Sequence, residues 1–145
     1  MVSESMKRLE WLTNKIPSLI ENQSSDFFNH RSAPGKWSRR QILGHLIDSA
    51  TNNHQRFVRA QFEEKPFITY DQDQWNLHSH YEDMDPMHIL RFWTIYNQHL
   101  IEVVKRFPED ALQRKCLTEK EVTLEWLIED YVVHLEHHLR QLVDY

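Results

Sequence analysis

Four stretches of the chain place hydrophobic residues at helical spacing, and none shows the alternation expected of a β-strand. The predicted helices span residues 5–21, 38–63, 85–107 and 123–145. The apolar side of the last one consists of Leu124, Leu127, Ile128, Tyr131, Leu135, Leu139 and Leu142. Four amphipathic segments in one short chain predict an all-α fold, a four-helix bundle.

The second helix has the clearest start signal. Ser38 and Gln41 have the spacing of a capping box, in which each side chain bonds the other residue's backbone N–H. Trp37 and Ile42 are placed to form a hydrophobic staple around this cap.

Prolines mark two other boundaries. Asp85 followed by Pro86 predicts the N-terminus of the third helix, because an aspartate caps well and proline is tolerated in the first turn. Pro17 lies inside the first predicted helix and should kink it or mark its end.

The connection between the second and third helices, residues 65–84, is long for a bundle. If extended, it could cross the whole bundle, which permits these two helices to run parallel. Long loops of this kind are often functional. Its aromatic residues Phe67, Tyr70 and Trp75 suggest that it packs over an opening.

Composition excludes several functional classes. The 145 residues fit a single domain, 1–145, and the net charge of −5 argues against a nucleic-acid partner. The chain has no apolar run long enough for a membrane span, and its N-terminus lacks a signal-peptide core. The single cysteine, Cys116, rules out an internal disulfide and fits a cytoplasmic location. Two glycines are too few for Gly-rich phosphate loops.

The last predicted helix contains two histidines on its apolar stripe. His134 and His138 are four residues apart, in line with Leu127, Tyr131 and Leu142. Imidazoles at this spacing can converge on one metal ion. Without an ion, two buried imidazoles would need separate hydrogen-bond partners, so the alternative is a pair of hydrogen-bonded core histidines.

A third ligand is expected from a facing helix, and His45 is the best candidate. It lies one turn into the second helix, flanked by Ile42, Leu46 and Ser49. A lone histidine near an apolar face is more often a core residue. Joined to the helical pair, however, it completes a three-histidine site with open positions, the usual plan of a catalytic metal centre.

Other candidates are weaker. Asp48 and Asp130 lie close to His45 and His134 and could orient them, but both are interpreted as ordinary exposed acids. Lys115 could lower the pKa of Cys116, yet a lone cysteine without a base is more often incidental. The remaining histidines are expected to be surface, loop or structural residues: His30, His54, His78, His80, His88, His99 and His137.

Three motifs together resemble the DinB-like superfamily. They are "GKWSRRQILGHLIDSATNNHQRF", the "ITYDQDQW" loop and the "TLEWLIEDYVVHLEHHLRQL" ending, and the likeness spans residues 10–142. The resemblance implies a four-helix bundle, often homodimeric. It also implies one divalent metal ion, zinc or nickel, held by three histidines that match His45, His134 and His138. Members of the family are described as metal-dependent hydrolases and bacillithiol S-transferases.

The implied chemistry follows from charge. Three neutral imidazoles leave an ion its full +2 charge, which can activate a water or deprotonate a coordinated thiol. The substrate would be a small molecule, and the resemblance favours thiol transfer because no acid or base with a clear hydrolytic role stands out. The alternative is a non-catalytic bundle that binds metal or dimerises.

Overall fold

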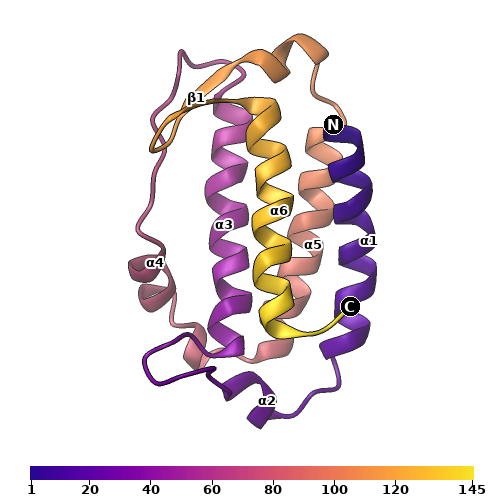
Figure 1. Cartoon of the computed structure of the whole chain (residues 1–145), viewed down its shortest axis with the longest axis vertical. Helices are drawn as coiled ribbons and strands as arrows, with labels where there is room; N and C mark the ends of the chain where they lie inside the picture. Colours follow the sequence, from indigo (N-terminus) through magenta and orange to yellow (C-terminus); the bar gives the residue numbers. More distant parts are fainter.

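The computed structural model describes all residues, Met1–Tyr145 (Figure 1). In chain order the elements are α1 (Val2–Ile20), α2 (Ser25–Asn29), α3 (Arg39–Arg59), α4 (Gln72–His78), the 3-10 helix η1 (Tyr81–Asp83), α5 (Pro86–Val104), the 3-10 helix η2 (Glu109–Gln113), β1 (Lys115–Leu117), β2 (Glu121–Thr123) and α6 (Leu124–Leu142).

The long helices α1, α3, α5 and α6 form a four-helix bundle, as predicted. Helix α3 packs against α5 and α6, and α1 packs against the same two helices. Figure 1 shows that α3 and α5 run in the same direction, while α1 and α6 run in the opposite one. The chain leaves α3 at one end of the bundle and returns along its side before α5 begins. The prediction of a crossing connection is therefore confirmed.

Helix starts follow the predicted caps. The Ser38 hydroxyl accepts from the Gln41 backbone N–H, and the Gln41 side chain accepts from the Ser38 backbone N–H, which completes the capping box. Asp85 caps α5, with Pro86 as its first residue. Thr123 caps α6 by accepting from the Trp126 backbone N–H. These side chains satisfy backbone donors that a helix N-terminus otherwise leaves unpaired.

Pro17 lies in the last turn of α1, which ends three residues later at Ile20, and the buried Ile16 and Ile20 hold this turn against the core. One expectation about local structure was wrong. The chain contains a strand pair that the pattern did not predict. Strands β1 and β2 pair antiparallel, with Cys116 opposite Val122. Three-residue strands are too short to show a clear alternation of side chains.

The core is formed by the apolar faces of the four long helices. Its largest fully buried side chains include Trp93, Phe57, Leu9, Leu12, Leu43 and Ile128. None of the helices combines the length and the hydrophobicity needed to cross a lipid bilayer.

The connection between α3 and α5 is partly ordered into helix, since it contains α4 and η1. Its aromatic residues do not all pack inward: Phe67 is 67% exposed. Tyr70 and Trp75 pack against each other, with ring centroids 5.9 Å apart. Asn76 anchors α4 to the bundle by donating to the Gln41 carbonyl of α3 at 2.8 Å. The connection therefore lies alongside α3 and forms a wall beside that helix (Figure 1).

Candidate metal centre

The three predicted histidines come together between α3 and α6. His45 extends from the first part of α3, and His134 and His138 extend from the last three turns of α6. One ring nitrogen from each lies within 4.8 Å of the corresponding nitrogens of the other two. The antiparallel arrangement of α3 and α6 produces this cluster, because it places the start of one helix beside the end of the other.

His45 is completely buried, and neither of its ring nitrogens has a hydrogen-bond partner. Leaving a buried polar atom unpaired costs about 1–3 kcal/mol. The ring instead packs against Trp37, whose ring centroid lies 4.8 Å away. An imidazole held in this way, with a free lone pair facing two other imidazoles, has the chemistry of a metal ligand.

His138 is oriented by its neighbour Gln141. The Nδ1 atom of His138 lies 2.9 Å from Oε1 of Gln141, an oxygen that can only accept. The proton is therefore placed on Nδ1, which leaves a lone pair on Nε2. That Nε2 lies 3.2 Å from Nε2 of His134. Two imidazole nitrogens bound to one tetrahedral ion would lie roughly 3.4 Å apart, so this pair already has the separation of a chelate.

The donor set fits a divalent ion. With the three nitrogens within 4.8 Å of one another, chelation requires a contraction of at most about 1.4 Å, which small side-chain rotations can supply. Three imidazoles suit zinc, nickel and other borderline ions alike.

Electrostatics keeps all three rings neutral at pH 7. Burial, followed by the neighbouring His138 and His134, lowers the pKa of His45 to about 3. Burial, with smaller contributions from His138 and His137, lowers the pKa of His134 to about 4. Burial also lowers the pKa of His138. A neutral imidazole is the form that binds metal, so the cluster is ready to coordinate at physiological pH.

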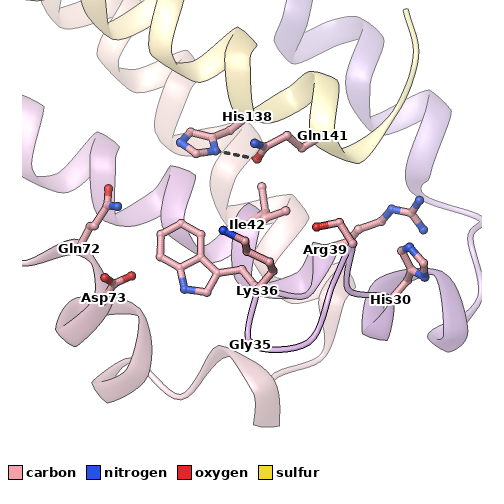
Figure 2. Close-up of a pocket in the computed structure, with 11 residues that line it drawn as sticks. His30, Gly35, Lys36, Arg39, Ile42, Gln72, Asp73, His138 and Gln141 are labelled. Carbon is pink, nitrogen blue, oxygen red and sulfur yellow. Dashed lines mark hydrogen bonds between the residues drawn. The ribbon is translucent and has the colours of Figure 1, made fainter.

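Two clefts reach the histidine cluster. The first, here called the Trp37 cleft, has a volume of about 570 Å³ and reaches His138. In Figure 2, His138 and Gln141 lie on one side of it, facing Ile42 and Lys36. Gln72 and Asp73 of α4 form one edge, and Arg39 and His30 lie at the other.

The second cleft, here called the Arg56 cleft, has a volume of about 870 Å³ and reaches His134. Its walls include Ser49, Asn53 and Arg56 of α3, together with Tyr70, Lys120 and Asp130. Gln72 lines both clefts. A small molecule can therefore reach His138 through the first cleft and His134 through the second.

The two acids proposed as orienting groups do not contact the histidines. Asp48 is only 2% exposed, so its interpretation as an exposed acid was wrong. Its carboxylate accepts a hydrogen bond from the Tyr81 hydroxyl at 2.5 Å, away from His45. Asp130 is exposed, as expected, and lines the Arg56 cleft beside His134. The two acids thus differ in burial, which tertiary packing decides and the local sequence does not reveal.

The remaining candidates have ordinary roles. Six of the other histidines are exposed: His30, His78, His80, His88, His99 and His137. His54 is partly buried instead, and its Nδ1 lies 2.9 Å from the Tyr96 hydroxyl. Cys116 is buried, and burial raises the pKa of its thiol. Lys115 pairs with Glu121 at 2.8 Å and does not activate the thiol.

Three site residues were not identified from the sequence: Trp37 beside His45, Gln141 beside His138, and Arg56 in the second cleft. Gln141 could have been found, since it lies three residues after His138 on the same helical face. From the sequence, Trp37 was predicted only to form the hydrophobic staple with Ile42. Nothing in the local pattern distinguishes Arg56 from the other basic residues of α3.

Comparison with known proteins supports this description. A model of the DinB superfamily matches residues 8–142. A protein of Oceanobacillus iheyensis named "Putative metal-dependent hydrolase OB0413" is 22% identical, over 97% of this chain and 83% of its own length. "Putative metal-dependent hydrolase YfiT" of Bacillus subtilis is 25% identical, over 94% and 79%.

A solved structure gives the same result for the fold. YfiT from Bacillus subtilis, described as "a probable metal-dependent hydrolase with an unusual four-helix bundle topology", aligns with a TM-score of 0.89. The alignment covers 97% of this chain and 83% of YfiT at 23% sequence identity. At this identity the likeness establishes the shared four-helix topology.

Proposed function

Given that this chain belongs to the DinB superfamily, we propose that it is a divalent-metal-dependent enzyme acting on a small molecule. His45, His134 and His138 are its metal ligands in this proposal. The observation that carries it is the buried His45 ring, with both nitrogens unpaired and facing two other imidazoles. The names of the relatives, metal-dependent hydrolases, support the same class of function.

Within this class we favour transfer of a small-molecule thiol. A divalent ion held by three neutral imidazoles would lower the pKa of a bound water or thiol. The hydrogen-bond partners of His134 and His138 are each other and Gln141, so no carboxylate lies in contact to act as a base. A thiol is acidic enough to need no such base, whereas activation of water usually uses one. The chain's own contribution is then to hold the rings neutral and oriented.

Hydrolysis is the second candidate, and Asp130 is the observation that favours it. This carboxyl lines the cleft that reaches His134, and partial desolvation by the cleft walls raises its pKa, as suits a group that exchanges protons. The variant Asp130→Asn separates the two activities. Hydrolysis assisted by Asp130 should fall by about 100-fold or more, whereas thiol transfer without a base should be little changed.

Metal content tests the ligand set directly. Untagged protein should contain about one divalent ion per chain, and the triple variant His45→Ala, His134→Ala, His138→Ala should lose it. His137→Ala is the matched control, because His137 lies on the same helix but is exposed. Unchanged metal content in the triple variant would reject this ligand set.

A chelator distinguishes a catalytic ion from a structural one. If the ion is catalytic, its removal should abolish activity while the helical circular-dichroism signal and the melting temperature stay nearly unchanged. If the bundle unfolds when the metal is removed, the ion acts as a structural link and the enzymatic proposal fails.

We also propose that the chain forms a homodimer through α5. Phe92 and Ile95 are 47% and 64% exposed on neighbouring turns of this helix, although both are large and apolar. Burial of such a patch against a second copy would stabilise a dimer. Ile95→Glu should then give a monomer by light scattering. Val133→Glu, at an equally exposed position of α6, should not.

A further inference from the structure

The Arg56 cleft has a polar floor that the metal site does not require. On α3, Ser49, Asn53 and Arg56 follow His45 at helical spacing, and all three line this cleft. Asn53 is buried and donates to the Ser49 carbonyl at 2.9 Å. The cleft therefore continues along α3 from the histidines to a guanidinium.

The Arg56 guanidinium is partly buried and has no carboxylate within ion-pair distance. Its Nε and Nη2 donate to the Ile68 carbonyl at 3.1 and 2.9 Å, and its Nη1 donates to Oδ1 of Asn53 at 3.3 Å. These bonds fix the side chain and leave two of its five N–H groups free. Placing a positive charge in such a position is costly unless an anion joins it.

The next arginine on the helix shows the usual arrangement. Arg59 pairs with Glu63, with its Nε donating to a carboxylate oxygen at 2.6 Å. Arg56 has neutral oxygen acceptors in place of such a partner, and burial lowers its pKa. Holding the connection at the Ile68 carbonyl occupies only part of the Arg56 guanidinium. Its two remaining N–H groups are left for a ligand.

The charges around this arginine indicate the anion it would accept. Lys120 adds a second positive charge to the cleft wall, and Glu119 and Asp130 add two negative ones. The formal charges of the four side chains cancel. The two acids oppose each negative charge that a ligand brings, so a single charge placed on the Arg56 guanidinium is accepted more readily than the two charges of a phosphate.

The length of the ligand follows from helix geometry. Arg56 bonds Asn53, which lies eight residues after His45, so the guanidinium is roughly 12 Å along the helix axis from the first ligand. The two free N–H groups lie on Nη1 and Nη2, the pair of atoms that can bond both oxygens of one carboxylate. The substrate would thus be an extended molecule with its reacting group at one end and a carboxylate at the other.

We propose that Arg56 binds the carboxylate of a monoanionic substrate whose reacting end lies at His45, His134 and His138. This inference rests on the proposed function for the position of the reacting end. It assigns the substrate class and the residue that selects it.

The proposal can be tested by loading the full chain with cobalt(II) and titrating it with thiols. Binding is followed by the thiolate-to-cobalt absorption band. Mercaptohexanoate should bind about tenfold more tightly than the neutral mercaptohexanol, the gain expected of one charge-assisted contact. Mercaptoacetate is too short to reach Arg56 and should show no advantage over mercaptoethanol.

Variants identify the residue responsible. Arg56→Gln should abolish the preference for mercaptohexanoate. If this variant does not fold, Arg56→Lys takes its place and should keep part of the preference. Arg59→Gln is the matched control and should keep all of it. A preference that survives in folded Arg56→Gln would overturn the proposal.

A second measurement uses neither metal nor thiol. In metal-free protein, hexanoate should slow phenylglyoxal modification of Arg56 but not of Arg59, as followed by peptide mass spectrometry, and hexanol should slow neither. Protection of Arg56 without any thiol binding would support the carboxylate site and reject thiol transfer. Thiol binding without a carboxylate preference and without protection would reject the role of Arg56 and leave the metal site standing.

Discussion

The ring of Tyr81 packs so closely against Gly44 that a Cβ at position 44 would overlap it. Tyr81 belongs to η1, just before α5, and its hydroxyl reaches Asp48 one turn further along α3. This contact seats the end of the crossing connection on α3, immediately beside His45, the candidate metal ligand that follows Gly44. The absence of a side chain at Gly44 is what allows it.

We therefore expect Gly44→Ala to destabilise the protein by about 1–3 kcal/mol, although alanine is the better helix former. Urea unfolding measures the effect. In a double-mutant cycle, Tyr81→Ala should remove most of the cost of Gly44→Ala. Gly35→Ala is the control, because its positive φ of 80° should cost stability whether or not Tyr81 is present. Additive effects of Gly44→Ala and Tyr81→Ala would contradict the contact argument.

The buried Asp48 should make stability depend on pH. Burial raises its pKa from 3.8 to about 6, against an opposing hydrogen bond from Tyr81. The folded state thus binds more protons than the unfolded state between these values. This carboxyl should lower the free energy of unfolding by up to about 3 kcal/mol as the pH rises from 4 to 6, with no further change above.

Chemical unfolding in the presence of a chelator, at several pH values, checks this expectation against Asp48→Asn. The variant should be the more stable protein at pH 7, and the difference should vanish near pH 4. Tyr81→Phe removes the opposing hydrogen bond and should shift the transition to higher pH. A pH profile shared by Asp48→Asn and the wild type would show that this carboxyl does not titrate as described.

Gln141 should control metal affinity through His138. Its Oε1 holds the Nδ1 proton, so Gln141→Leu removes the group that directs the Nε2 lone pair to the site. Loss of such an outer partner typically weakens metal binding by about 10–100-fold. Competition titration with a chromophoric chelator measures the affinity. Gln141→Glu keeps an acceptor and should bind at least as tightly as the wild type.

Trp37 should slow the exchange of the bound ion. Its ring covers His45, with centroids 4.8 Å apart, and borders the cleft that reaches His138. Trp37→Ala should therefore speed removal of the metal by a chelator severalfold. Trp11→Ala, on the exposed face of α1, is the control and should leave the rate unchanged. An unchanged rate in Trp37→Ala would mean that the ion leaves through the Arg56 cleft.

The predicted helices were close to those observed because helix formation is encoded locally. The capping box of Ser38 and Gln41, and Asp85 followed by Pro86, mark the same starts in the structure. Apolar spacing over many turns likewise identifies the buried face of α6. The pairing of His134 with His138 is local too, since it needs only four residues of one helix.

Only the tertiary structure decided how these parts meet. It brought His45 to the pair, buried Asp48 and left Asp130 exposed, all through the packing of α3 against its neighbours. It also placed Trp37 against His45 and directed Arg56 into a cleft beside the crossing connection. The physical reason is the range of the interactions. Helical periodicity and caps act within a few residues, whereas burial and contacts between helices depend on segments far apart in the chain.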